Sequence, residues 1–399
     1  MTSPTDILAA GYDFFAPPRI AFGWGRRREV GTLARSLGTR RAFLVTGARL
    51  AAGGAPLDEI QTALSAAGLQ PILAASISRE PEVTDVDNAV DWLRAHEASA
   101  GDVMIAIGGG SVIDLAKAAA AIVTNSAGGS VLDYLEGVGR GLQITVPPVP
   151  LVAMPTTGGT GTEATKNAVI SCYDPPFKKS LRSDLMVPRV VLVDPELAVT
   201  LPPSATAACG MDAITQCIES YISRRAKPIA RALAAEGLRR AVPALATAVN
   251  EPANRPAREA MAHAALLSGM ALANSGLGLA HGVAAALGVH ARTRHGLACA
   301  IMLPVALATN RPHCEAELAT LARTIWNEHW PSDSAAADAF VARIGILCRT
   351  VGVPQRLRDI HVAREQIPAL VAGSHGNSLD GNPFAIFDEQ LQTILERMW

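Results

Sequence analysis

Two kinds of hydrophobic pattern divide the chain near residue 195. Before that point, short apolar runs bounded by turn residues recur, and each has the length of a buried β-strand. These runs are AFLVTG (42–47), PILAASIS (71–78), VMIAIGGG (103–110), LVAMPTT (151–157) and VVLVDP (190–195). Amphipathic stretches such as LDEIQTALSAAG (57–68) and DNAVDWLRAHE (87–97) lie between the runs and predict crossover helices. The alternation predicts an α/β domain with a parallel sheet.

After about residue 200, apolar residues recur at three- and four-residue spacing, which is typical of helices packed on a core. The breaker segments NEPANRP (250–256) and NRPH (310–313) mark connections between such helices. We therefore expect two domains, a nucleotide-type α/β domain over 1–195 and an all-helical domain over 196–399. The natural ligand site of such a pair is the cleft between its domains.

The composition excludes several classes of function. Of the 399 residues, 49% are hydrophobic and 18% charged, and the formal net charge is -1, which is typical of a globular protein. This balance gives no electrostatic reason to expect nucleic acid or an anionic membrane as partner. The six cysteines contain no C-x-x-C pair, which favours free thiols in a reducing compartment. The chain shows neither a secretory signal pattern nor an apolar run long enough to span a bilayer, so we expect a cytoplasmic location.

Two glycine-rich turns follow predicted strands. GGGSVIDLAK (108–117) ends a buried strand and opens a helix, where glycines let a polyphosphate approach the main chain and the helix start offers N–H groups. MPTTGGTGTEAT (154–165) places threonine hydroxyls among glycines after the next strand. An alternative interpretation of the first turn alone is a tight strand-to-helix connection without a ligand. Two such turns at neighbouring strand ends indicate a dinucleotide.

Six motifs, in their order and spacing, resemble the iron-containing, or group III, alcohol dehydrogenase family. They are GGGSVIDLAK, PTTGGTGTEAT, VVLVDPEL, GMDAI, GLGLAHGVAAALG and RHGLACAIMLP, and the resemblance runs from PPRIAFGWG (17–25) to GNPF (381–384). It implies an N-terminal dinucleotide-binding domain and a helical C-terminal domain for metal and substrate. It further implies hydride transfer between NAD or NADP and a small alcohol or aldehyde.

The resemblance also implies a set of cofactor contacts. The residues around the pyrophosphate, the adenosine and the nicotinamide would be Gly109, Gly110, Ser111, Thr156, Thr157, Thr160, Thr165 and Lys178. Lys179 is one position away from Lys178 and is an alternative for the contact near the nicotinamide ribose. Asp114 and Lys117 are interpreted as residues that stabilise the helix.

One departure from the family concerns the choice of cofactor. NAD-preferring members resemble VTD after the first strand, where the carboxylate can bind the ribose hydroxyls and repel a 2′-phosphate. This chain has VTGAR (45–49), with Gly47 in the place of that carboxylate and Arg49 close by. Loss of the repulsion should admit NADP. Alternatively, Gly47 is a simple turn glycine and NAD remains the cofactor.

The resemblance implies a divalent metal site as well. The family's four ligand positions read Asp212, Gln216, His281 and His295 in this chain. Asp212 and Gln216 are four residues apart, so they share a helix face and can point into one cavity. A carboxylate, two imidazoles and an amide oxygen suit Zn²⁺ or Fe²⁺ and leave room for a substrate oxygen. Such an ion would act as a Lewis acid on the alcohol.

Two further departures keep other interpretations open. Gln216 stands where the family has a ligand histidine, and Ala285 stands where it often has a histidine that relays a proton. Since an amide oxygen is a poorer donor to a borderline-soft metal, a metal-free reductase similar to the maleylacetate reductases is an alternative. A non-catalytic nucleotide-binding protein is another. Apolar helices and the family resemblance also favour a homo-oligomer.

Overall fold

The computed structural model describes residues 11–37, 40–125 and 129–399, and these residues form two compact units. The sheet unit comprises Ala16–Thr157 and Thr162–Val199. The helical unit comprises 11–15, Gly158–Gly161 and Thr200–Trp399. The chain thus leaves the sheet unit four residues after the expected boundary at 195. A short piece of the threonine-rich turn, Gly158–Gly161, also belongs to the helical unit.

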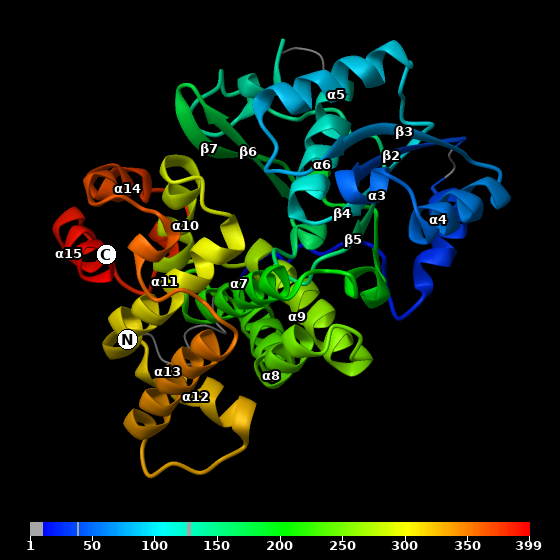
Figure 1. The fold of residues 1–399 in the computed structure, drawn as a ribbon. Helices are drawn as coiled ribbons and strands as arrows, with labels where there is room; N and C mark the ends of the chain where they lie inside the picture. Colours follow the sequence, from blue (N-terminus) through cyan, green and yellow to red (C-terminus); the bar gives the residue numbers. More distant parts are fainter. Residues whose placement is uncertain (1–10, 38–39, 126–128) are drawn as a thin grey trace. The chain divides into compact units, whose positions relative to one another are not determined.

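A six-stranded parallel sheet forms the centre of the sheet unit, in the order β1-β8-β5-β4-β2-β3 (Figure 1). Its strands are β1 (Ile20–Phe22), β2 (Arg41–Gly47), β3 (Gln70–Ile77), β4 (Val103–Gly108), β5 (Leu151–Pro155) and β8 (Val190–Val193). Every residue of β4, β5 and β8 is buried, as expected for parallel strands covered on both faces. The predicted parallel α/β domain is confirmed, and the carboxyl ends of β2, β4 and β5 meet at one edge of the sheet.

Helices cover both faces of this sheet. Side chains alternate along each strand, so the apolar strands present apolar residues on both faces. The helices are α2 (Val30–Arg35), α3 (Ala48–Ala51), α4 (Ala55–Ala66), α5 (Val83–Ala95) and α6 (Gly110–Thr124). Met104 and Ala106 of β4 pack in the cluster that contains α5 and α6 residues, whereas Ile105 and Ile107 pack in the cluster that contains α2 and α4 residues. A separate antiparallel hairpin consists of β6 (Asn167–Tyr173) and β7 (Pro176–Arg182).

The helical unit is built on one hydrophobic core, and its predicted all-helical character is confirmed. Its helices are α7 (Pro203–Ile222), α8 (Pro228–Asn250), α9 (Arg255–Ala273), α10 (Leu279–His290), α11 (His295–Asn310), α12 (Glu315–Trp326), α13 (Asp333–Thr350), α14 (Ile367–Gly373) and α15 (Asp388–Met398). Gly210 lets α7 approach α8 closely, because a Cβ there would lie 2.3 Å from Leu245 Cδ1. Helix α11 packs against both α7 and α10, which brings three helices together around one point.

Over the described ranges, none of the helices has both the length and the apolar character needed to cross a membrane.

Candidate functional site

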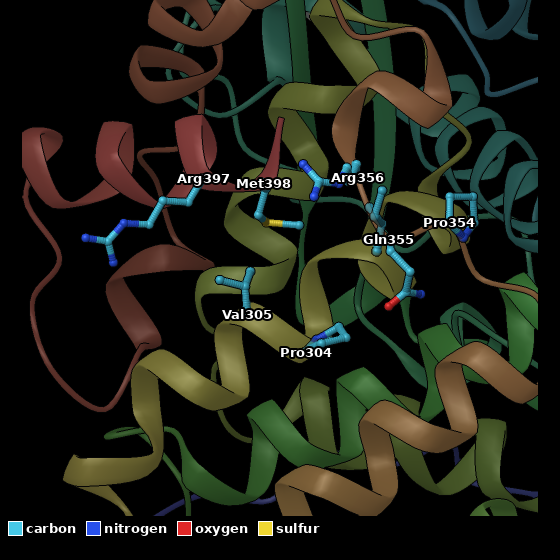
Figure 2. A pocket seen from close by; sticks show the side chains of 8 residues that line it. Pro304, Val305, Pro354, Gln355, Arg356, Arg397 and Met398 are labelled. Atoms are coloured by element: carbon cyan, nitrogen blue, oxygen red, sulfur yellow. The ribbon is translucent and has the colours of Figure 1, made fainter.

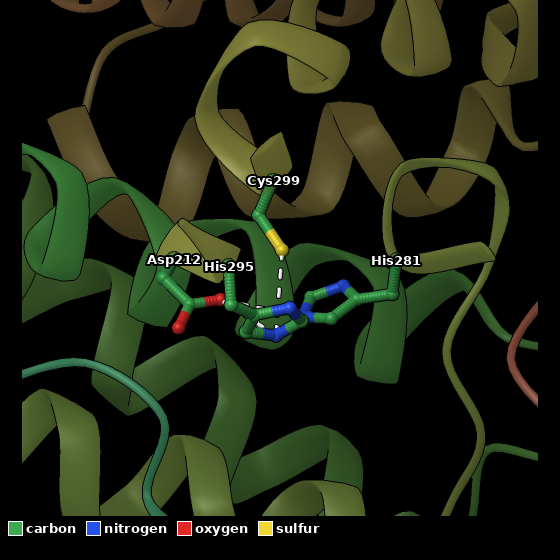
Figure 3. Close-up of side chains that lie close together, drawn as sticks. All are labelled: Asp212, His281, His295 and Cys299. Carbon is green, nitrogen blue, oxygen red and sulfur yellow. Dashed lines mark hydrogen bonds and ion pairs between the residues drawn. The ribbon is translucent and has the colours of Figure 1, made fainter. Parts of the chain in front are cut away.

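Four side chains that can bind a metal ion converge in the helical unit (Figure 3). Asp212 comes from α7, His281 from α10, and His295 and Cys299 from α11. Each offers one ligand atom, and the four atoms all lie within 4.8 Å of one another. The structure therefore brings together Asp212, His281 and His295 of the implied metal ligands, and it places Cys299 beside them, which the sequence analysis missed.

Helix geometry explains how this cluster of Asp212, His281, His295 and Cys299 forms. His295 begins α11 and Cys299 follows one turn later, so both side chains lie on one face of that helix. Cys299 Sγ lies 3.6 Å from His295 Nε2. Asp212 Oδ1 lies 3.4 Å from His281 Nε2 and 3.9 Å from His295 Nε2. Asp212 Oδ1 thus lies within 4 Å of a nitrogen of each imidazole.

The cluster passes a test of fit for a divalent cation. Asp212 and His281 are only 1% and 3% exposed, yet Asp212 Oδ1 and His281 Nε2 have no hydrogen-bond partner. Buried polar atoms without partners are costly, and a cation between them would satisfy both. Donor atoms at about 2.0–2.3 Å from a tetrahedral ion lie roughly 3.3–3.8 Å apart. The observed separations of 3.4, 3.6 and 3.9 Å are close to that range.

Glu219 holds His281 in the orientation that this site needs. The Nδ1 atom of His281 donates to Glu219 Oε2 over 2.7 Å, which leaves Nε2 for the cluster. The same carboxylate accepts main-chain N–H groups from the start of α10, those of Gly278, Ala280 and His281. A carboxylate behind a histidine ligand fixes its tautomer and raises its basicity. Sequence analysis missed Glu219, although it lies two helical turns after Asp212 on the same face of α7.

The electrostatics of the cluster favour a positive ion. Burial raises the pKa of the Cys299 thiol to about 12. Burial also acts to raise the pKa of Asp212, but the His295 and His281 imidazoles outweigh it and hold that pKa below its ordinary value. Burial acts to lower the pKa of His281, and Cys299, Asp212 and Glu219 together raise it well above the ordinary value. The centre of the cluster is therefore a buried carboxylate that stays ionised and would stabilise a cation.

Replacing Glu219 by glutamine is expected to weaken divalent-metal affinity by about 10–100-fold, the usual effect of losing a carboxylate behind a histidine ligand. In the parent, the carboxylate accepts hydrogen bonds from main-chain N–H groups at the start of α10. The amide of glutamine would present its own N–H groups to them, so the side chain that orients His281 would lose its place. Titration of zinc against a chromophoric chelator measures the change. Glu236→Gln, which removes a half-buried carboxylate paired with Arg239, is the matched control. Parent-like zinc affinity in Glu219→Gln would contradict the anchoring role.

Gln216, the fourth ligand implied by the sequence, uses its amide nitrogen in two hydrogen bonds. Its Nε2 donates to the Thr160 carbonyl oxygen over 3.0 Å and to Ser268 Oγ over 2.8 Å. Ser268 Oγ donates its own hydrogen to the Ala265 carbonyl, so it can only accept from Gln216. These contacts fix which end of the amide faces Thr160 and connect α7 to α9 and to the segment Gly158–Gly161. The role of Gln216 as a metal ligand stays a prediction.

Gly47 lies at the carboxyl end of β2 in an ordinary extended conformation. Its φ of -70° and ψ of 146° are accessible to any residue, and a Cβ there would meet nothing nearer than Ile77 O and Val112 Cγ2, both at 4.0 Å. The interpretation of Gly47 as a turn glycine therefore has no support in the backbone. The position therefore has room for a carboxylate side chain.

The glycine-rich turn after β4 has the geometry expected for an anion site. Gly109 precedes α6, and a Cβ on it would lie 3.2 Å from Thr157 Cγ2, so only glycine fits without displacing that threonine. Gly110 and Ser111 form the first turn of α6, where main-chain N–H groups have no partner within the helix. Thr156 is held beside this turn, since its N–H donates to the Gly108 carbonyl over 3.0 Å. The contacts of Gly109, Gly110 and Ser111 with the pyrophosphate, and those of Thr156 and Thr157 with the adenosine and nicotinamide, stay predictions.

Thr165 makes buried contacts inside the sheet unit. Its hydroxyl accepts from Lys117 Nζ over 2.9 Å, and the same ammonium donates to Thr162 Oγ1 over 2.9 Å. Asp114 Oδ1 in turn accepts from Thr162 Oγ1. Asp114 and Lys117 thus do more than stabilise α6, because they attach that helix to the 3₁₀ turn Thr162–Ala164. A cofactor contact of Thr165 stays a prediction, and its observed bonds favour a structural role.

Replacing Lys117 by methionine is expected to lower the free energy of unfolding by about 3–5 kcal/mol, the usual effect of removing one member of a buried ion pair. The Lys117 side chain is fully buried, and burial lowers its pKa to about 8. Its loss leaves the Asp114 carboxylate and two threonine hydroxyls without their cation. Urea unfolding followed by circular dichroism measures the change. Lys166→Met, which breaks a surface pair with Asp184, should cost less than about 1 kcal/mol. Equal effects in both variants would contradict the argument.

Lys178 lies on β7 opposite Ser171 of β6. Its Nζ pairs with Glu80 Oε2 over 2.7 Å, and its side chain is nearly buried. Lys179 points to the other face of the hairpin, because side chains alternate along a strand. A contact of Lys178 with the nicotinamide ribose stays a prediction.

A pocket of about 290 Å³ opens beside α11 and α15 (Figure 2). Its lining residues are Ile301, Pro304, Val305, Pro354, Gln355, Arg356, Arg397 and Met398. The lining contains no acid, histidine or cysteine, so it offers neither a general base nor metal ligands. The cluster around Asp212 is therefore the stronger candidate for chemistry.

Comparison with known proteins identifies the family to which both regions of the chain are similar. The model of the iron-containing alcohol dehydrogenase family matches residues 17–195, and the model of its C-terminal region matches residues 206–399. The NAD-dependent methanol dehydrogenase of Bacillus methanolicus is 33% identical over 359 residues, which are 90% of this chain and 92% of that protein. The lactaldehyde reductase of Escherichia coli K12 is 32% identical, covering 94% of this chain and 97% of that protein.

A solved structure agrees with these matches. The crystal structure of 1,3-propanediol oxidoreductase superposes with a TM-score of 0.89 at 31% identity, covering 98% of this chain and all of that chain. The matches span both units, so the fold and the order of the motifs are shared over nearly the whole length.

Proposed function

Because the chain belongs to the iron-containing alcohol dehydrogenase family, and is therefore an NAD(H)-dependent oxidoreductase of alcohols and aldehydes, we propose that Asp212, His281 and His295 hold its divalent ion. The observation that supports this assignment is the meeting of two buried donor atoms without hydrogen-bond partners, Asp212 Oδ1 and His281 Nε2, beside His295. When bound, the ion supplies Lewis-acid polarisation of the substrate oxygen.

The remaining residues position the reactants. Glu219 keeps His281 Nε2 directed into the cluster, and the turns containing Gly109, Gly110 and Thr156 receive the dinucleotide. In alcohol oxidation the bound dinucleotide would accept the hydride of the alcohol, and the hydroxyl proton would be released. Because Ala285 carries no imidazole one turn after His281, that proton leaves through water or a ribose hydroxyl. The small side chain at this position also leaves space for a substrate larger than a short aldehyde.

NADP is accepted at least as well as NAD in this proposal. The support is Gly47, where an absent carboxylate removes the group that would repel a 2′-phosphate. The relatives named above include an NAD-dependent enzyme, so this preference is a departure of the present chain.

The test combines metal analysis of the purified protein with steady-state reduction of a series of aldehydes by NADH and by NADPH. Turnover that is lost on chelation and restored by Zn²⁺ or Fe²⁺ is the expected result. Full turnover by metal-free protein would replace this proposal with a metal-free reductase similar to the maleylacetate reductases. Cofactor binding without any turnover would indicate a nucleotide-binding protein.

Two expectations about the whole protein stay predictions. A cytoplasmic location follows from the free cysteines, and a homo-oligomer follows from the family resemblance. Sedimentation velocity of the purified chain measures the second.

A further inference from the structure

We propose, building on the metal site proposed above, that the Cys299 thiolate replaces Gln216 as the fourth protein ligand and that the site selects zinc over iron. The family's histidine at position 216 is missing from this chain, and the structure places a different donor in the cluster. The fourth ligand and the preferred metal are thereby named, which goes beyond the metal site proposed above.

The position of Cys299 is that of a ligand. Its side chain is fully buried, and its Sγ lies 3.6 Å from His295 Nε2 and within 4.8 Å of the donor atoms of Asp212 and His281. Figure 3 shows the thiol directed from α11 toward the two imidazoles. Independently of the cysteine, Asp212 Oδ1 and His281 Nε2 are buried and without hydrogen-bond partners at the same point. A cation at this point would contact all four donors.

The contacts of Gln216 hold its amide in one orientation. Both hydrogens of its amide nitrogen are used, one on the Thr160 carbonyl and one on Ser268 Oγ. Turning the amide would break both bonds inside a buried region, which costs about 1–3 kcal/mol for each group left unsatisfied. Cys299 Sγ already lies in the cluster, 3.6 Å from His295 Nε2, and needs no such rearrangement.

The donor set then determines the metal preference. A carboxylate, two imidazoles and a thiolate resemble zinc sites, because soft thiolate ligands favour Zn²⁺ over the harder Fe²⁺. On binding, the S–H bond of Cys299 breaks, its proton passes to solvent, and a sulfur–metal bond forms with no change of oxidation state.

The experiment uses cobalt and zinc in the full chain. Cobalt-substituted parent protein is expected to show a thiolate-to-cobalt charge-transfer absorption in the near ultraviolet. Cys299→Ser should lose this absorption and bind zinc at least about tenfold more weakly, the lower bound for disturbing a ligand set. Cys348→Ser, which alters an equally buried thiol on α13, is the matched control and should keep both properties. Parent protein supplied equally with both metals should contain more zinc than iron.

A rescue variant distinguishes lost ligation from lost folding. Cys299→Ser combined with Gln216→His restores the histidine of the family and should recover zinc affinity without the charge-transfer absorption. Cobalt binding by the parent without that absorption would overturn the thiolate ligand and leave the metal site of Asp212, His281 and His295 standing. Absence of any metal binding, with His281→Ala as active as the parent, would overturn the proposed function itself. If Cys299→Ser does not fold, the charge-transfer absorption of the cobalt-substituted parent decides whether Cys299 is a ligand.

Discussion

His281→Ala is expected to reduce kcat/KM by at least about a hundredfold, while NAD(P)H still binds. Loss of a residue that only supports a metal ligand costs up to about a hundredfold, and loss of a ligand itself should cost at least as much. The imidazole is buried between Asp212 and Glu219, so its removal takes away one donor and leaves two carboxylates facing a void. Of the predicted cofactor contacts, only Thr160 belongs to the same unit as His281, and it lies on a separate segment, Gly158–Gly161. Steady-state kinetics, metal content and fluorescence titration with NADPH measure the three quantities.

The control for this prediction is His290→Ala on the same helix. His290 lies outside the metal-binding cluster, so its loss should change kcat/KM by no more than about twofold, as for ordinary substitutions away from a site. Full activity of His281→Ala at unchanged metal content would contradict the assignment of this cluster as the reaction centre.

Gly47→Asp is expected to shift the enzyme from NADPH toward NADH by at least about tenfold in the ratio of kcat/KM values. A like-charge contact with the 2′-phosphate costs several kcal/mol, and each 1.4 kcal/mol or so is a factor of ten. The backbone at this position accepts aspartate, since φ is negative and the nearest atoms to a Cβ are 4.0 Å away. An aspartate would also stand at the N-cap of α3, where it is favoured.

Gly47→Asn is the matched control, because it has the size of aspartate without the charge. A large shift in the aspartate variant and a small one in the asparagine variant assign the effect to charge. Equal shifts in both would assign it to shape. A parent enzyme that already prefers NADH by more than tenfold would show that another residue excludes the 2′-phosphate.

The sheet could be predicted wherever strands are apolar and buried on both faces. The runs at 42–47, 103–110 and 151–157 contain β2, β4 and β5 almost residue for residue. The hairpin of β6 and β7 was missed because PFKKSLR has polar residues at successive positions, so it shows neither an apolar run nor a clean alternation. Strand β1 was missed because three residues at a sheet edge carry too little pattern.

The candidate site was predicted only as far as the family motifs extend. Asp212, His281 and His295 are in the expected motifs, and the structure brings them together. Cys299 and Glu219 were not predicted, because their importance depends on how α7, α10 and α11 pack. A spacing signal did exist for both, since Cys299 follows His295 by four residues and Glu219 follows Asp212 by seven, each on a shared helix face.

The hydrogen bonds of Gln216 join three segments of the helical unit at one side chain. Its amide nitrogen connects α7 to Thr160 in the segment Gly158–Gly161 and to Ser268 of α9. Any substitution at position 216 therefore disturbs helix packing as well as changing the donor atoms near the cluster. Gln216→His is expected to lose both contacts even where its imidazole gains an ion.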